Sequence, residues 1–339
     1  MNSVSDSVPG VRSPLRLNSR LLLLRALLAR PEVAVPAWQT LQDRSDVPAP
    51  DPALWRVLPL LHARLQGKEA ILEPARAEGT RTLAAAAATA FEQTRYRNAL
   101  LLAAAEEAVT ALAAAGLPVA LLKGAALVSS AYADPALRPM SDADLLVRPE
   151  DAVRALSLLH DAGWQTGFEA TPQNLARSHS APLTTAALGS IDLHWRAFDG
   201  TSLAGDDAPL WAEATNARFG AVEVRVPARE ALFVHACLAG TRFEGEAAWR
   251  WMADAAALVA DDSGRALSWS HVESEAVRLA EPRAVADAVE AIAGDLEMAV
   301  PRGLISALRA APLPWVARTA STARRAAPEN RSALQAAAL

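Results

Sequence analysis

Cysteine and lysine are both scarce in this chain of 339 residues. The one cysteine, Cys237, excludes an intrachain disulfide framework and a metal site built from several thiolates, and it favours a reducing, cytoplasmic setting. Of the 33 basic residues only Lys68 and Lys123 are lysines, a bias typical of a GC-rich genome. In such a chain, a lysine can mark a position that needs a compact ammonium group rather than a planar guanidinium.

Long apolar runs and excess positive charge are also missing. No stretch reaches the roughly 18 apolar residues needed to span a bilayer, so no membrane association is expected. The run Leu21–Ala29 is short, is interrupted by Arg25 and has no clear cleavage site before Pro31, which favours an amphipathic helix over a signal peptide. The formal net charge of −5 argues against general binding of duplex DNA.

Alanine and leucine dominate the hydrophobic 52% of the chain, and both are strong helix formers. Residues 1–16 are rich in Ser, Pro and Arg and are expected to lack fixed structure. Residues 17–116 form an N-terminal helical region in this interpretation. Its longest helix covers 82–115, which contains no glycine or proline, and Gly116 is a suitable residue to end it.

Residues 117–226 have a different character and predict a compact α/β core. A helical C-terminal region is expected at 227–315 and a flexible tail at 316–339. The predicted fold class is therefore α+β, with a small mixed-sheet core between two helical regions. Strands are expected at VALL (119–122), SDADLLV (141–147), QTGFE (165–169), APLTTAA (181–187) and SIDLHWRAF (190–198).

Asp142 and Asp144 form the only D-x-D motif in the sequence. Alternate residues of a strand point to the same face, so both carboxylates should project together. Close carboxylates repel one another unless a cation lies between them, and oxygen ligands of this kind suit Mg²⁺ or Mn²⁺. In a chain with 38 acidic residues, however, a D-x-D motif alone is also typical of exposed acids at the polar start of a strand. Asp192, near the start of another apolar strand, adds a third carboxylate that could share metal ions or act as a base.

Lys123 and Gly124 lie where the first predicted strand meets the next helix. The backbone N–H groups of a helix N-terminus favour an anion there. Glycine permits close backbone approach to a phosphate, and Lys123 can neutralise its charge. Alone, a lysine-glycine pair between a strand and a helix is weak evidence for a phosphate site. The D-x-D motif about 20 residues later strengthens this evidence.

The segment LLKGAALVSSAYADPALRPMSDADLLVRPEDAVRALSLLHDAGW closely resembles the core of a bacterial family of uncharacterised nucleotidyltransferases within the DNA polymerase β-like superfamily. The family shows a lysine-glycine turn, an R-P-x-x-D-x-D-L-L-V segment, and a helix that ends in glycine and an aromatic residue. The segment IDLHW resembles the part that carries the third carboxylate. The resemblance covers roughly 117–260. Its motif residues here are Lys123-Gly124, Arg138-Pro139, Asp142 to Val147, and Gly163-Trp164.

This resemblance implies transfer of a nucleoside monophosphate from a nucleoside triphosphate such as ATP to a hydroxyl or similar group, with release of pyrophosphate. Mg²⁺ or Mn²⁺ would be the cofactor. The acceptor stays open between a small molecule, a peptide, a protein and RNA. Catalysis and metal binding are assigned to Asp142, Asp144 and Asp192, and nucleotide binding to Lys123, Gly124, Arg138 and Ser141.

Several of these residues also have structural interpretations. Arg138 is a candidate for steadying the triphosphate or for folding the turn before the acids, and Ser141 for a phosphate contact or a turn cap. His194 shares a strand face with Asp192 and is a candidate substrate contact or a buried, hydrogen-bonded side chain. His235 is expected in the core. Asp254 is a candidate for lining the cleft, with the structural partner of an arginine as the favoured interpretation.

Two other functions are consistent with the sequence. A D-x-D glycosyltransferase would bind a nucleotide sugar through a metal, but its fold places several strands before the motif, where this sequence is helical. A degenerate domain of the same fold would bind a nucleotide or a partner without catalysis. Retention of all three acids argues for the enzyme.

Overall fold

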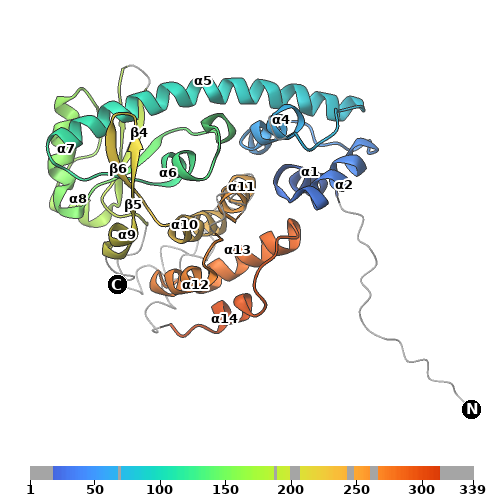
Figure 1. Cartoon of the computed structure of the whole chain (residues 1–339). Helices are drawn as coiled ribbons and strands as arrows, with labels where there is room; N and C mark the ends of the chain where they lie inside the picture. The colour runs from blue at the N-terminus through green and yellow to red at the C-terminus, as the bar shows by residue number, and fades with distance from the viewer. Residues whose placement is uncertain are drawn as a thin grey trace, which may run out of the picture.

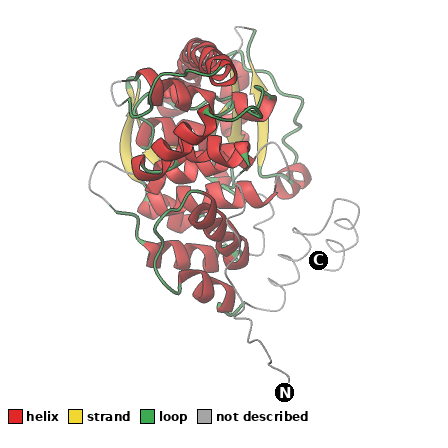
Figure 2. Ribbon diagram, turned by 90° about the vertical axis from the view of Figure 1, so that its right-hand side faces the viewer, coloured by secondary structure: helices red, strands yellow, loops and turns green. Residues whose placement is uncertain are grey.

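The computed structural model describes residues 18–67, 70–186, 189–198, 207–242, 248–259 and 266–313. The segments predicted to be disordered, 1–16 and 316–339, lie outside the described residues. Helices surround one six-stranded sheet (Figure 1). Figure 2, turned by 90°, shows the strands at the two sides of the upper part of the molecule, with helices between them and below. The α+β class with a small mixed sheet is confirmed.

The N-terminal part is helical, as predicted. Its first helix, α1, is nevertheless buried around most of its circumference, with Leu22, Leu23 and Ala26 all at 2% exposure or less, so the prediction of an amphipathic helix was wrong. Neighbouring helices cover the face that an isolated amphipathic helix would leave to water. The helices are α1 (Ser19–Leu28), α2 (Pro31–Gln42), α3 (Pro52–Trp55), α4 (Leu58–Gln66) and α5 (Glu78–Ala114).

The 37-residue helix α5 ends as the sequence predicts. Gly116 has φ +76°, a left-handed conformation that glycine adopts without steric cost. The N–H of Leu117 donates to the carbonyl of Leu112 at 3.0 Å, and that of Gly116 donates to Ala113 at 2.9 Å. This pair of bonds is the Schellman motif, which satisfies the last helical carbonyls and turns the chain towards the sheet.

The sheet has the strand order β3-β4-β2-β1-β6-β5. Strand β2 is central: it pairs antiparallel with β1 and parallel with β4. This parallel pairing places Asp144 directly beside Asp192. The strands are β1 (Ala120–Leu121), β2 (Ala143–Leu146), β3 (Ser180–Thr184), β4 (Ser190–His194), β5 (Thr215–Phe219) and β6 (Val222–Val226).

Two parts of the strand prediction differ from the structure. QTGFE forms no strand, because only Gln165 pairs, as an isolated bridge with Thr184. The hairpin of β5 and β6 was not predicted, although VEVRV alternates apolar and polar residues and Gly220 forms its turn with φ +58°. The hairpin extends the sheet because β6 pairs parallel with β1.

Further helices connect the strands of the sheet, and helices also make up the described chain after the last strand. Within the described residues no helix is both long and apolar enough to cross a membrane. The hydrophobic core extends from Leu22 in α1 to Leu308 in α14. The remaining helices are α6 (Lys123–Ser130), α7 (Ala152–Asp161), α8 (Pro172–Arg177), α9 (Ala208–Glu213), α10 (Arg229–Arg242), α11 (Ala248–Val259), α12 (Trp269–Arg278), α13 (Pro282–Asp295) and α14 (Leu304–Ala310), with 3₁₀ turns η1 (Pro135–Leu137) and η2 (Pro149–Asp151).

Candidate active site

Two carboxylates come together on adjacent strands. Asp144 in β2 and Asp192 in β4 are register partners of a parallel pair. The neighbouring residues Ala143, Leu145 and Leu193 are fully buried and anchor both strands in the core. Since alternate residues share a face, this anchoring turns the two carboxylates to the same side of the sheet. The prediction that these acids lie on neighbouring strands is confirmed.

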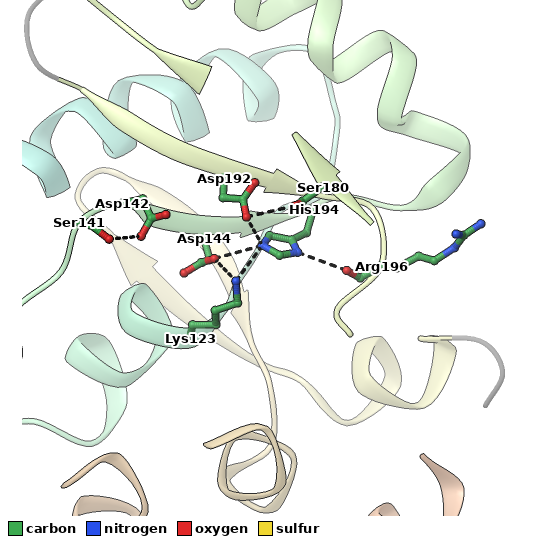
Figure 3. Close-up of polar contacts among 8 residues, drawn as sticks. All are labelled: Lys123, Ser141, Asp142, Asp144, Ser180, Asp192, His194 and Arg196. Atoms are coloured by element: carbon green, nitrogen blue, oxygen red, sulfur yellow. Dashed lines mark hydrogen bonds and ion pairs between the residues drawn. The ribbon is translucent and has the colours of Figure 1, made fainter. Parts of the chain in front are cut away.

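Lys123 reaches this pair from the first residue of α6. Its Nζ lies 2.5 Å from Oδ1 of Asp144 and 3.3 Å from Nε2 of His194 (Figure 3). Lys123 adopts φ +42°, in the left-handed region, which costs a non-glycine residue about 1–3 kcal/mol. Backbone strain of this kind is concentrated at functional sites, and here it accompanies a lysine held against Asp144 and His194.

His194 bridges the two carboxylates. Its Nε2 lies 3.1 Å from Oδ1 of Asp144 and 3.0 Å from Oδ2 of Asp192, and its Nδ1 lies 3.3 Å from the carbonyl oxygen of Arg196. The imidazole is fully buried. His194 therefore belongs to the centre of the cluster, and its spacing of two residues from Asp192 on one strand face was the signal for that position.

The charges in this cluster balance one another. Burial acts to raise the pKa of Asp144, but the hydrogen bond with His194 and the charge of Lys123 outweigh it and hold this pKa at about 2. The pKa of Asp192 is also lowered: the hydrogen bond with His194 overcomes the opposing effect of burial. Burial lowers the pKa of His194, yet its hydrogen bonds to the two acids raise it overall. Lys123 and His194 thus both favour the ionised form of the two carboxylates.

The donor atoms fit a divalent cation. Asp144, Asp192 and His194 each offer one ligand atom, and these atoms lie within 4.8 Å of one another. Oδ1 of Asp192 is buried and has no hydrogen-bond partner among the described residues. An unpaired buried carboxylate oxygen is costly, and a cation would satisfy it. Carboxylate oxygens suit Mg²⁺ or Mn²⁺, and an imidazole nitrogen suits a transition metal.

Comparison with known proteins identifies the family. A family model described as uncharacterised nucleotidyltransferase matches residues 55–292. The chain belongs to this family of nucleotidyltransferases. No curated protein matches. Among solved structures, the antibiotic-resistance factor ANT(2'')-Ia is similar at 12% identity with a TM-score of 0.35, over 52% of this chain and 89% of that chain. That similarity is too low to place individual residues.

Asp142 and Ser141 lie beside the cluster rather than within it. Strand β2 of this nucleotidyltransferase begins at Ala143, so Asp142 precedes the strand. The Ser141 hydroxyl donates to Oδ1 of Asp142 at 2.9 Å. In Figure 3 these two residues lie at the left, to one side of Asp144, Lys123 and His194. Asp142 is therefore a further carboxylate at the entrance to β2, outside the compact group of ligand atoms.

Arg138 pairs with an acid outside the carboxylate cluster. It is buried, and its Nη2 and Nε donate to Asp254 in α11 at 2.9 and 3.2 Å. The hydroxyl of Tyr132 donates to the same carboxylate at 2.8 Å. The prediction that Asp254 pairs with an arginine is confirmed. Of the two interpretations of Arg138, the contacts match the one in which it folds the turn before the acids.

Gly124 is packed against the same turn. A Cβ at this position would overlap Nη1 of Arg138 and would lie 2.7 Å from Sδ of Met140. The missing side chain therefore makes room for the Arg138 guanidinium. This packing gives the glycine a structural reason that is independent of any phosphate.

His235 lies apart from these groups. Its ring contacts Phe198 with centroids 4.8 Å apart, at the side of α10 nearest the end of β4. It is partly buried, consistent with the expected packing role.

Proposed function

We propose that this nucleotidyltransferase moves a nucleoside monophosphate from a nucleoside triphosphate to a hydroxyl of an acceptor and releases pyrophosphate, with Mg²⁺ or Mn²⁺ as cofactor. The observation that carries the proposal is the register pairing of Asp144 with Asp192, which share His194 and leave one buried Asp192 oxygen unpaired. Family membership supports the same chemistry.

Asp144, Asp192 and His194 would hold the cation, with Asp142 available as a further carboxylate. When bound, the divalent ion would supply Lewis-acid stabilisation of the charge that develops on the phosphate oxygens. Because Mg²⁺ is commonly bound through one or two carboxylates together with substrate phosphates, this donor set suits a site completed by the nucleotide.

Lys123 would bind the nucleotide phosphates. Its side chain is 37% exposed, whereas that of Asp144 is 6% exposed, so the ammonium group is the more mobile partner of the pair. A flexible four-carbon stem lets it exchange Asp144 for a phosphate oxygen. The N-terminus of α6, with no side-chain cap, offers backbone N–H groups beside it.

In the transfer, the acceptor oxygen bonds to the α-phosphorus while the bond from that phosphorus to the oxygen of the leaving pyrophosphate breaks. The hydroxyl proton passes to Asp192. The lowered pKa of Asp192 keeps it ionised at neutral pH, so the carboxylate has room for this proton and, as a weak base, readily passes it on to water.

The double variant Asp142→Asn with Asp144→Asn tests the proposal. Pyrophosphate release from each common nucleoside triphosphate, measured with and without Mg²⁺, should fall by about 10³-fold or more, the scale expected when catalytic groups are removed. Asp161→Asn, an exposed acid on α7, is the matched control and should behave as the wild type.

Unchanged Mg²⁺-dependent turnover in the double variant would overturn the proposal. A wild type that binds nucleotide without turnover would support a non-catalytic domain instead. The glycosyltransferase alternative has less support, because no strand precedes β1 in the described residues. Incubation with α-labelled nucleoside triphosphates and a cell extract, followed by identification of the labelled product, would name the acceptor.

A further inference from the structure

A cavity of about 340 Å³ lies beside the D-x-D loop, between the N-terminal helices and α11. Its volume is within the range of small-molecule sites. Residues from the end of α3, the middle of α5, the loop before β2 and the start of α11 line it. These segments are far apart in the sequence. The residues that define this arginine pocket are Trp55, Arg56, Arg97, Asn98, Ser141 and Arg250.

The arginine pocket brings three guanidinium groups around one cavity. The guanidinium groups of Arg56, Arg97 and Arg250 form no hydrogen bond or ion pair with another residue in the part of the chain that the structure describes. Arg56 and Arg97 are exposed, whereas Arg250 is partly buried. A guanidinium stays charged at any physiological pH, so three of them around one cavity attract an anion.

The surroundings of Arg250 strengthen this view. Burial lowers its pKa, and the positive charge of Arg138 lowers it further. The charge of Arg56 also lowers the pKa of Arg250. Asp254 and Asp142 raise this pKa, but they offset the lowering only in part. Placing a cation in such surroundings is unfavourable until a counter-ion arrives, and the described part of the chain supplies none in direct contact.

The pocket is separated from the position proposed for the nucleotide phosphates. Met140 lines the pocket and also fills the space over Gly124, together with Arg138. Lys123 and the start of α6 therefore lie on one side of this packed layer and the arginine pocket on the other. Ser141 belongs to the pocket, and its hydroxyl donates to Asp142, so the pocket borders the carboxylates at the Asp142 end.

We propose that the arginine pocket binds a phosphate or carboxylate group of the acceptor and holds its hydroxyl beside the carboxylate cluster. This inference rests on the proposed nucleotidyl transfer. Charge-assisted hydrogen bonds from guanidinium groups suit both anions, and Trp55 offers an apolar wall for the carbon skeleton. Acceptors with several positive charges are repelled from this pocket, which makes an anionic small molecule or an acidic peptide the acceptor class.

The floor of the pocket is fixed to the D-x-D loop. Asn98 is 1% exposed, and its Nδ2 donates to the carbonyl oxygens of Pro135 and Arg138 at 2.7 and 2.8 Å. Helix α5, which also carries Arg97, is thereby tied to the turn before Asp142. An anion held by Arg97 is consequently positioned relative to the acids by rigid elements.

The experiment titrates inorganic phosphate into protein saturated with Mg²⁺ and a non-hydrolysable nucleoside triphosphate analogue, followed by calorimetry. Phosphate should bind the loaded wild type, and Arg97→Gln or Arg56→Gln should weaken that binding by about 10-fold or more, the scale of one charge-assisted hydrogen bond. Affinity for the analogue itself should stay the same. Arg95→Gln is the matched control, because Arg95 lies on the same helix but pairs with Glu92.

Two results would overturn the proposal. One is equal phosphate binding by the wild type and both pocket variants. The other is a matching loss of affinity for the nucleotide analogue, which would assign the arginines to the nucleotide instead of the acceptor. Failure of the proposed function itself is distinguishable, because it appears as absent Mg²⁺-dependent pyrophosphate release, while phosphate binding to the unloaded protein still tests the pocket.

Discussion

Two buried aspartates of this protein each pair with a cation, and the two pairs differ in design. Asp254 is held by the planar guanidinium of Arg138 through two donors, and both side chains are at most 8% exposed. Asp144 is held by the single ammonium of Lys123, whose side chain is 37% exposed. A bidentate, enclosed pair fixes two segments together, whereas a single contact to a half-open lysine can be exchanged for another cation. The first pair ties α11 to the turn before β2, and the second belongs to the candidate site.

The largest effect expected from this contrast is on turnover. Asp144→Asn should reduce Mg²⁺-dependent pyrophosphate release by about 10³-fold or more, because a ligand of the proposed metal is lost. Single-turnover measurements with an α-labelled nucleoside triphosphate would show it. Activity within the range of the wild type would place the chemistry elsewhere.

Asp254→Asn should act on stability instead. Removing one partner of a buried ion pair leaves the Arg138 charge uncompensated and costs about 3–5 kcal/mol of unfolding free energy. Urea denaturation followed by circular dichroism would measure this loss. Glu290→Gln, which breaks an exposed pair with Arg309, is the control and should change little. An equal loss of unfolding free energy in Asp254→Asn and Glu290→Gln would show that the buried ion pair contributes no more to stability than the exposed one.

Gly124→Ala tests the packing around the structural pair. The new methyl group would overlap the Arg138 guanidinium and should cost about 1–3 kcal/mol of unfolding free energy, as overpacked sites do. Gly167→Ala, where nothing lies within 4 Å of the added carbon, provides the comparison. A neutral Gly124→Ala would show that Arg138 moves aside without loss.

The smallest effect is expected from the cation alone. At a Mg²⁺ concentration ten times its dissociation constant, binding to the native state should add about 1.4 kcal/mol to the unfolding free energy of the wild type. A chelator should reverse the gain, and Asp144→Asn should not show it. Asp161→Asn should retain it. Equal stabilisation of Asp144→Asn would exclude this aspartate as a ligand.

Local signals in the sequence predicted much of the fold. Gly116 ends α5 because only its left-handed conformation closes the last turn, and this requirement is visible in the sequence. The burial of α1 was not visible, because its partners come from distant segments: Arg25, for example, donates to the carbonyl of Asp295. The β5–β6 hairpin was missed even though its alternation and Gly220 were available.

The site was predictable to the extent that it depends on strand register. Asp144 and Asp192 each stand near the start of an apolar strand, and a parallel pairing places them side by side. The partner of Arg138 is 116 residues away in α11, and no local pattern assigns one acid among 38 to it. The central position of His194 follows from its partners on both strands, which only the assembled sheet supplies.

Helix α5 has a consequence for how the molecule unfolds. At 37 residues it extends for about 55 Å, packs against α4 near one end, and contacts α7 and β4 towards the other (Figure 1). The helices before the sheet and the sheet itself therefore share one continuous backbone element. Fraying at either end is resisted by the packing at the other, so both parts should lose structure in a single cooperative transition, and a protease should find no weak joint between them.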